Sequence, residues 1–322
     1  MDSYSPSLND AVRHENTAEP ATFAMAAALS AAMPAATSAA TPAPRDTRAL
    51  SGDALLALPL ADLAREKPKM RPGKAWHHFQ ELLKDKERTE EVFYIFEALP
   101  WAGFMDAAER YSDSAEGRAA MRDEPYLPAL LDDHEALRRF PAGSVAHAYC
   151  DFMEKEGLTA AGLVEEFDRF REGRTVYIDK FDWYSNRNRD THDLLHVLTG
   201  YGRDALGEAC VLAFTYSQSP SLAHLFIGYM AGLNIKKQVK SKAPVLRAIR
   251  EGQRLGKACP RVSELPIREL LAMPLDEARK SLNITPARHY AEVHRMWKEG
   301  GINPYDMLGN GPATGDAKLA TA

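Results

Sequence analysis

Cysteine is scarce in this chain of 322 residues, which contains only Cys150, Cys210 and Cys259 and no CxxC pair. The three lie far apart, and any disulfide scheme leaves one unpaired, which favours a reducing compartment. The sequence also lacks excess basic charge: its net charge of −5 argues against an extended basic face for nucleic acid. Alternating strand patterns are few, and the best, at 175–178, is too short to build a sheet. These absences predict an all-α protein with no nucleic acid partner.

Several recognisable signals are missing as well. The uncharged run at 20–44 is preceded by Asp2, Asp10, Glu15 and Glu19, whereas a signal peptide begins with a basic segment. A mitochondrial presequence is rich in arginine and poor in acids, so we expect a bacterial cytoplasmic protein. The chain contains no G-x-S-x-G elbow, no Walker loop and no complete G-x-G-x-x-G. Serine hydrolase, P-loop NTPase and Rossmann interpretations therefore lack support.

Composition divides the chain into a domain with two tails. Residues 1–50 are rich in Ala, Pro, Thr and Ser without a steady apolar period, which predicts a disordered tail. Residues 51–300 carry apolar residues at helical spacing, with Ser144 and Thr159 placed as N-caps, and predict a single multi-helix domain. Residues 301–322 contain Gly, Asn, Pro and Ala and predict a flexible C-terminal tail.

A pair of histidines, His192 and His196, is the strongest functional signal. The segment 190–200 has helical apolar spacing, with Asp190 or Thr191 available as a cap near its start and Gly200 as a C-terminal stop. On such a helix the two histidines are four residues apart and share one face, where both imidazoles can reach one metal ion. Asp193 lies about 100° round the helix and either completes the coordination sphere or orients a ligand.

Glu208 joins this site only if the chain reverses direction. On one continuous helix it would lie about 18 Å beyond His196 along the axis. Gly200 and Gly202 permit a turn, and a new helix from about Asp204 would return Glu208 to the histidines. The alternative is that an HxxxH pair merely hydrogen-bonds in a core or on a surface, but a carboxylate among apolar neighbours needs a partner. Zn²⁺, our first expectation, and Fe²⁺ both suit these ligands.

The motif and its spacing resemble a known family. His192-Asp193-x-x-His196, followed by eleven residues and Glu208, is similar to the H-D-x-x-H-x11-E signature of the coenzyme Q (ubiquinone) biosynthesis protein four family. The flanking stretches 194–200 and 206–208 also look like that family, and weaker similarity extends over about 90–290. The resemblance implies that all four motif residues hold the metal. It also implies a homodimer that associates with other ubiquinone-biosynthesis enzymes.

An uncharged run follows Glu208, because no Asp, Glu, Lys or Arg occurs at 209–235. The polar stretch 217–221 divides it into two halves, each too short for a bilayer of about 30 Å, so we expect two buried helices and no transmembrane span. Gly228 and Gly232 would let another helix or a lipid approach closely. Most of the large residues are predicted to be core, and some of them to line an apolar interhelical lipid pocket; they are Phe214, Tyr216, Leu222, Leu225, Phe226, Ile227, Tyr229 and Met230.

The resemblance implies a reaction. The family is implicated in the oxidative decarboxylation of a polyprenylated hydroxybenzoate, in which a hydroxyl replaces the ring carboxylate. A metal-dependent decarboxylase acting on a 4-hydroxy-3-methoxy-5-polyprenylbenzoate type of substrate would need a cationic site beside an apolar wall, and the sequence offers both. Candidate substrate-binding residues are Tyr201 and Arg203 at the turn and Phe226, Met230 and Lys236 after it.

Two alternatives stay open. One is a non-catalytic lipid-binding scaffold that organises ubiquinone-biosynthesis enzymes at the membrane, with a structural metal. The other is a metal-dependent hydrolase, because H-D-x-x-H resembles the zinc-protease motif H-E-x-x-H; Asp193 is one methylene shorter than the Glu of that motif. Lys236, Lys237, Lys240 and Lys242 either contact anionic lipid head groups or form a solvated face. Contact of these lysines with lipid head groups predicts peripheral association with the bacterial inner membrane.

Overall fold

The computed structural model describes residues 46–84, 88 and 90–305 of the chain. Most of the two predicted tails, residues 1–45 and 306–322, therefore lies outside the described residues. The last five residues of the predicted N-terminal tail are described, and two of them, Asp46 and Thr47, are buried. Thr47 donates a hydrogen bond to Asp182 at 3.1 Å, which attaches this segment to the helical domain.

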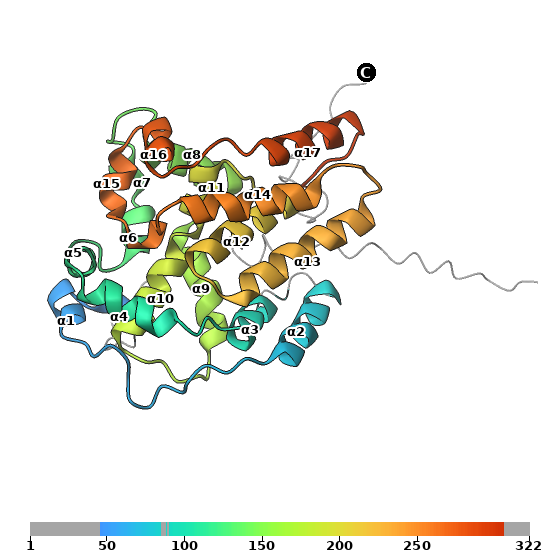
Figure 1. The fold of residues 1–322 in the computed structure, drawn as a ribbon. Coiled ribbons are helices and arrows are strands. Elements are labelled where there is room, and N and C mark those ends of the chain that lie inside the picture. The colour runs from blue at the N-terminus through green and yellow to red at the C-terminus, as the bar shows by residue number, and fades with distance from the viewer. Residues whose placement is uncertain (1–45, 85–87, 89, 306–322) are drawn as a thin grey trace, which may run out of the picture.

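Helices follow one another through the described residues without a β-strand, which confirms the all-α prediction (Figure 1). Ser144 and Pro274 form an isolated bridge. The elements in chain order are η2 (Thr47–Ala49), α1 (Gly52–Leu56), α2 (Pro72–Lys84), α3 (Glu90–Ala98), α4 (Phe104–Asp113), α5 (Ala115–Asp123), α6 (Leu127–Leu131), α7 (His134–Leu137), α8 (Val145–Glu156), α9 (Ala160–Arg171), α10 (Lys180–Asp190), α11 (His192–Thr199), α12 (Ala205–Gln218), α13 (Leu222–Gln238), α14 (Val245–Ala258), η3 (Val262–Glu264), α15 (Ile267–Ala272), α16 (Leu275–Ser281) and α17 (Arg288–Glu299).

Local signals in the sequence set several of these boundaries. The Ser144 hydroxyl accepts a hydrogen bond from the backbone N–H of His147 and caps α8, and Thr159 caps α9 in the same way, as predicted. Of the two predicted caps, Asp190 and Thr191, it is Thr191 that occupies the N-cap position of α11, but its hydroxyl makes no capping bond and instead donates to the carbonyl of Asn188. The reason is that α10 runs to Asp190, so Thr191 is the junction of two helices and not the end of a loop.

Helix α12 lies at the centre of the larger core and packs against α13 and α14 (Figure 1). Two glycines of α14 allow this close contact. A Cβ on Gly252 would lie 2.5 Å from the Cys210 carbonyl oxygen, and one on Gly256 would lie 2.2 Å from that of Phe214. Gly228 of α13 similarly faces the backbone of α12. Backbone contact of this kind fixes the position of α12, which carries Glu208.

Part of the predicted core is wrong, because several of its residues lie on the outer face of α13. Phe214 and Ile227 are fully buried, but Leu222 is 45% exposed. The other predicted core residues are only half-buried, and these are Tyr216, Leu225, Phe226, Tyr229 and Met230. The physical reason is that the neighbouring helices cover α13 only in part, so an apolar composition does not place all of its residues inside. Leu233 is also exposed on this helix, and Trp76 of α2 is exposed beside Phe226.

A buried ion pair lies in another part of the fold. Arg187 of α10 donates from Nη2 to Glu124 Oε2 at 2.7 Å, and both side chains are almost inaccessible. The second carboxylate oxygen of Glu124 accepts from the backbone N–H of Arg268 at 2.6 Å. Arg187 also donates to the carbonyls of Ser263 and Leu265. This pair therefore joins α10, the end of α5 and the segment that leads into α15.

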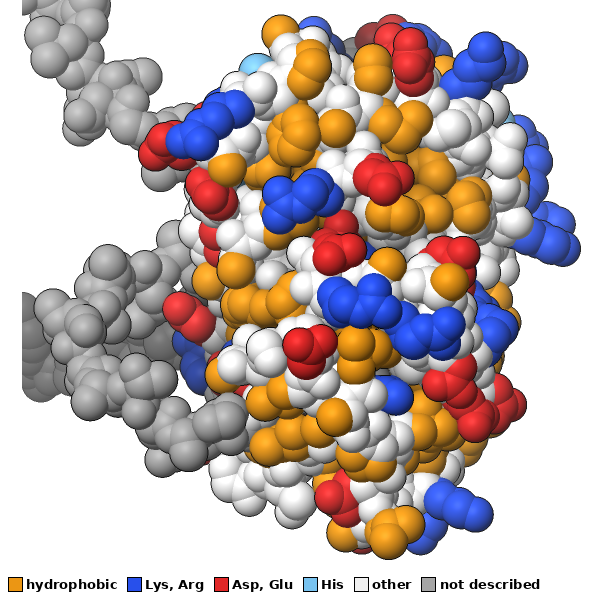
Figure 2. Space-filling model, turned by 90° about the vertical axis from the view of Figure 1, so that its left-hand side faces the viewer, with side chains coloured by type: hydrophobic (Ala, Val, Ile, Leu, Met, Phe, Trp, Pro, Cys, Tyr) orange, Lys and Arg blue, Asp and Glu red, His pale blue; other side chains and the backbone are white. Residues whose placement is uncertain are grey.

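The surface is mixed in character on the face that carries α1, α5 and α15. Apolar, acidic and basic side chains are interspersed there, and neither sign of charge forms a continuous area (Figure 2). Among the described residues, no helix is both long enough and apolar enough to cross a membrane. The uncharged run is divided between α12 and α13 at Ser219, as the sequence predicts.

Candidate metal centre

The chain reverses direction between α11 and α12, and this reversal builds the site. Gly200 ends α11 in the left-handed conformation, with φ of +76°, as its position in the sequence predicts. Asp204 then caps α12, where its Oδ1 accepts from the backbone N–H groups of Leu206 and Gly207. A Cβ on Gly207 would lie 1.9 Å from the carbonyl oxygen of Gly202, so only glycine lets the turn close over the first turn of α12.

Two imidazoles and a carboxylate meet where the helices converge. The Nε2 atoms of His192 and His196 are 3.3 Å apart. Glu208 Oε2 lies 3.5 Å from the first nitrogen and 3.4 Å from the second. Glu208 is completely buried, yet neither of its carboxylate oxygens has a hydrogen-bond partner among the described residues. A buried carboxylate without a hydrogen bond is rare in proteins and needs another source of compensation.

Asp193 belongs to the same cluster. Its carboxylate and the ring nitrogens of His192 and His196 each offer a donor atom, and these atoms lie within 4.8 Å of one another. Burial raises the pKa of Asp193, and the neighbouring histidines partly offset this effect. The structure thus places two carboxylates next to the histidine pair, Asp193 from α11 and Glu208 from α12.

The donor set fits a divalent metal ion. Metal–ligand bonds of about 2.0–2.1 Å at tetrahedral angles separate neighbouring donor atoms by about 3.3–3.4 Å. The three separations of 3.3, 3.4 and 3.5 Å around His192, His196 and Glu208 match that value. A cation at their centre would also bind the carboxylate of Glu208, which has ion pairs but no hydrogen bond among the described residues.

The family assignment follows from comparison with known proteins. The sequence profile of the family described as "Coenzyme Q (ubiquinone) biosynthesis protein Coq4" matches residues 83–288, which is more than half of the chain. The chain belongs to the Coq4 family. Coq4 proteins take part in ubiquinone biosynthesis, so the predicted resemblance is confirmed.

Individual relatives show how far the similarity extends. A protein of Danio rerio named "Ubiquinone biosynthesis protein COQ4 homolog, mitochondrial" is 26% identical over 206 residues, which is 63% of this chain and 72% of the relative. A protein of Culex quinquefasciatus named as COQ4 homolog 2 is 32% identical over 33% of this chain and 45% of the relative. One from Aedes aegypti is 25% identical over 40% and 44%. The matched segment thus spans less than half the length of the two mosquito relatives.

Contacts around the Coq4 motif orient His196. Its Nδ1 lies 3.0 Å from the carbonyl oxygen of Tyr201, so Nδ1 carries the proton and Nε2 is left to face Glu208. The ring of Phe152 from α8 stacks on the other side, with centroids 5.4 Å apart. These contacts fix both the tautomer and the direction of the imidazole.

Charge coupling dominates the electrostatics of the site. Burial alone would raise the pKa of Glu208, but the charges of His196 and His192 outweigh it and hold this pKa far below its ordinary value. Burial lowers the pKa of His196, whereas Glu208 raises it, and the net shift is upward. A negative carboxylate is therefore favoured at this position, and it provides the charge that a divalent cation needs.

The predicted substrate residues are placed differently from one another. Arg203 is buried beside the site, with Nε 3.9 Å from Glu208 Oε1. Tyr201 contacts the site only through its backbone, because its ring is buried against Tyr290. Phe226, Met230 and Lys236 all lie on α13, where Phe226 packs on Trp76 and Phe79 and Lys236 is exposed. Within the described part of the chain, no hydrogen bond, ion pair or ring contact joins these three to the predicted metal ligands.

His224 of α13 is a buried histidine near the site that the sequence analysis did not single out. Burial, together with the charge of His192, lowers its pKa to about 3, so its imidazole stays neutral at physiological pH. Its ring packs edge-on against Phe96, with centroids 4.7 Å apart. A signal was available in the sequence, because His224 is the only histidine in the uncharged run at 209–235.

Proposed function

We propose that this Coq4 protein catalyses a metal-dependent oxidative decarboxylation of a polyprenylated hydroxybenzoate, of the 4-hydroxy-3-methoxy-5-polyprenylbenzoate type. The ring carboxylate leaves as CO₂, and one oxygen atom of O₂ takes its place on the ring as a hydroxyl. A two-electron donor, together with two protons, reduces the other oxygen atom to water. The observation that carries this proposal is Glu208, whose carboxylate has no hydrogen bond among the described residues and faces two imidazole nitrogens at the spacing of metal ligands. Membership of a ubiquinone-biosynthesis family supports the pathway.

His192, Asp193, His196 and Glu208 would hold the ion, with Zn²⁺ the first candidate and Fe²⁺ the second. Such an ion supplies Lewis-acid stabilisation of the charge that develops on the ring as CO₂ leaves, and Fe²⁺ would also supply redox chemistry that Zn²⁺ lacks. His196 is held in the ligating tautomer by the Tyr201 carbonyl. Arg203 would bind the anionic head group, because its buried guanidinium lies next to the carboxylate of Glu208.

The outer face of α13 supports a lipid substrate and a membrane surface. Leu222, Phe226, Met230 and Leu233 recur at helical spacing along it, and two of the four are about half exposed. Four lysines follow at the end of the helix and just after it, all of them exposed, and these are Lys236, Lys237, Lys240 and Lys242. An apolar stripe next to basic residues suits peripheral binding to an anionic bilayer. We propose peripheral association with a bacterial inner membrane, as a homodimer and together with other ubiquinone-biosynthesis enzymes.

The same stripe favours a second candidate function. A non-catalytic scaffold that holds polyprenyl precursors and recruits other enzymes would need the apolar face of α13 and the lysines, with the metal in a structural role. The two functions differ in the coordination of the metal. A catalytic centre that depends on Glu208 keeps one coordination position open for substrate, whereas a structural metal site is closed.

Complementation separates the two functions. A ubiquinone-deficient bacterial strain receives the wild type, Glu208→Ala, Glu208→Gln or Glu91→Gln, and its ubiquinone content is measured alongside metal analysis of the purified proteins. Glu91 is a matched control because it is also buried and also pairs with a histidine, His78. We expect wild type and Glu91→Gln to restore ubiquinone and both Glu208 variants to fail.

Two results would contradict the catalytic function. If Glu208→Ala loses its metal and still restores full ubiquinone, the scaffold function is supported. If the wild type contains no stoichiometric metal, both the catalytic and the structural roles of the metal are wrong.

A further inference from the structure

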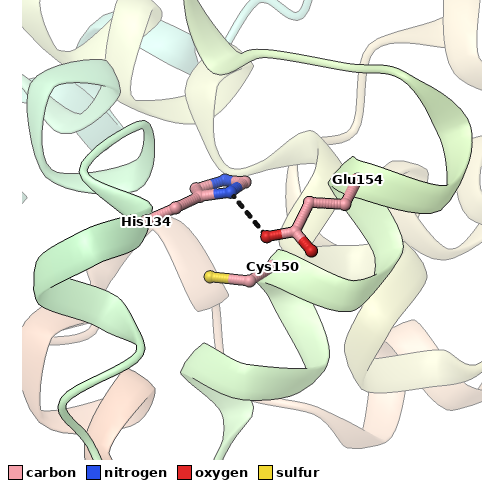
Figure 3. A group of neighbouring side chains, drawn as sticks. All are labelled: His134, Cys150 and Glu154. Carbon is pink, nitrogen blue, oxygen red and sulfur yellow. Dashed lines mark hydrogen bonds and ion pairs between the residues drawn. The ribbon is translucent and has the colours of Figure 1, made fainter.

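A second group of metal-ligating side chains lies where α7 meets α8, apart from the motif. His134 begins α7, and Cys150 and Glu154 lie one turn apart on α8 (Figure 3). Each offers one donor atom, a ring nitrogen, a sulfur and a carboxylate oxygen, and these atoms lie within 4.8 Å of one another. His134 Nδ1 is 3.2 Å from Glu154 Oε1. The Cys150 side chain lies beneath the imidazole, and this cysteine is fully buried.

Arg138 orients the carboxylate of this group. Its Nη2 donates to Glu154 Oε2 at 2.8 Å, which leaves Oε1 directed to His134. Its Nη1 donates to Asp151 at 2.6 Å. The charges balance around a divalent cation: a Cys150 thiolate and the Glu154 carboxylate would neutralise the ion, while Asp151 neutralises Arg138. Arg138 thus acts as the outer partner that ligating carboxylates commonly have.

The donor types select a class of metal. A thiolate, an imidazole and a carboxylate suit Zn²⁺ and similar borderline-soft ions, whereas Mg²⁺ and Ca²⁺ prefer oxygen ligands alone. Tetrahedral Zn²⁺ with a bond of about 2.3 Å to sulfur places its donor atoms about 3.5 Å apart. The 3.2 Å between His134 Nδ1 and Glu154 Oε1 is close to the separation of about 3.3–3.4 Å expected of a nitrogen and an oxygen ligand. Rotation of these partly exposed side chains over the buried sulfur would bring it to ligand distance as well.

We propose that His134, Cys150 and Glu154 bind a second divalent metal ion of the Zn²⁺ class, which ties α7 to α8. The ion would stabilise the helix that also carries Phe152, whose ring stacks on His196 of the first site. This second site stands independently of the proposed decarboxylation.

Cobalt titration tests the site directly, because sulfur ligation has its own spectroscopic signature. Metal-free protein is titrated with Co²⁺, and the near-ultraviolet thiolate-to-cobalt charge-transfer band is followed. The four residues of the first site contain no sulfur, so a band reports only a cysteine ligand. We expect the wild type to bind two equivalents of Co²⁺ and to show the band. The His192→Ala/His196→Ala double variant should lose one equivalent and keep the band.

Cysteine variants assign the band. Cys150→Ser should lose the band and one equivalent, whereas Cys259→Ser, a matched change of another buried cysteine, should keep both. Glu154 is 53% exposed, so Glu154→Gln leaves the helical fold intact and should weaken Co²⁺ binding at this site tenfold or more. The proposal is overturned if the wild type shows no sulfur band, if the band survives in Cys150→Ser, or if Glu154→Gln binds Co²⁺ as tightly as the wild type.

Discussion

Glu124 and Glu208 are both buried carboxylates, but they differ in their hydrogen bonds. This difference distinguishes a structural ion pair from a candidate binding site. Each oxygen of Glu124 accepts a short hydrogen bond, one from Arg187 and one from the backbone of Arg268. Neither oxygen of Glu208 has a hydrogen-bond partner among the described residues, and its nearest groups are two imidazole nitrogens. Glu124 is therefore fully hydrogen-bonded within the protein. Glu208 faces only the charges of two imidazoles and of Arg203, and we propose that a bound cation completes its compensation.

The largest expected effect is on metal binding at Glu208. Glu208→Ala should weaken metal affinity by at least about 100-fold, because it removes a ligand and not merely an outer partner, whose loss costs about 10–100-fold. The affinity is compared between folded proteins, because the variant also loses the charge pairs of Glu208 with His192 and His196. Competition with a chelator measures the affinity. A variant that keeps wild-type affinity would place the metal elsewhere.

Glu124→Gln should have the opposite pattern, with a loss of stability and no loss of metal. Removing the charge leaves Arg187 buried without its counter-ion, which lowers the free energy of unfolding by about 3–5 kcal/mol. Metal content per folded molecule should stay at the wild-type value. Urea denaturation and metal analysis check both parts. A loss of metal without a loss of stability would remove the distinction between the two carboxylates.

The helix contact that supports Glu208 is tested at Gly256. A Cβ there would lie 2.2 Å from the Phe214 carbonyl oxygen, so Gly256→Ala must displace α14 from α12 and should lower the free energy of unfolding by about 1–3 kcal/mol. Gly73→Ala in α2 is the matched control, because nothing lies within 4 Å of its Cβ position. That variant should be neutral or slightly stabilised. Equal thermal shifts in the two variants would contradict the close packing of α12 and α14.

The smallest expected effect is on the reactivity of the cysteine thiols. Burial keeps these thiols neutral, whereas the neighbouring histidines keep the buried Glu208 charged. Burial raises the pKa of the Cys259 thiol from 9.0 to about 12, and it also raises those of Cys150 and Cys210. Metal-free native protein should therefore react very slowly with thiol reagents near pH 8, and the urea-unfolded chain should react fully. Since the folded pKa exceeds the unfolded one, stability falls as pH rises from about 9 towards 12. Rapid reaction of all three native thiols would contradict this.

Short-range patterns predicted the core of the site. The spacing of His192 and His196 gave a shared helical face, and Gly200 and Asp204 marked the end of one helix and the start of the next, where the structure places them. The sequence also pointed to Glu208, because a carboxylate in apolar company needs a partner. These predictions depend on contacts within a few residues or on a single turn.

Long-range contacts account for what the sequence left out. The need for Gly207 appears only when its distance to the Gly202 carbonyl is known. His224 comes within electrostatic range of His192 through the packing of α13 against α12. The partner of Arg187 lies 63 residues away, so no local pattern announces that pair. Leu222 was misplaced in the core because composition does not reveal which side of α13 is covered.

The central claim is that the site catalyses decarboxylation. The most direct test measures the release of labelled CO₂ from a carboxyl-labelled polyprenyl hydroxybenzoate by the purified, metal-loaded protein. The account predicts labelled CO₂ with the wild type, its loss on removal of the metal, and none with Glu208→Gln, while Glu91→Gln remains active. Wild-type protein that restores ubiquinone in cells but releases no CO₂ with any metal would contradict the catalytic role of the His192, Asp193, His196 and Glu208 site.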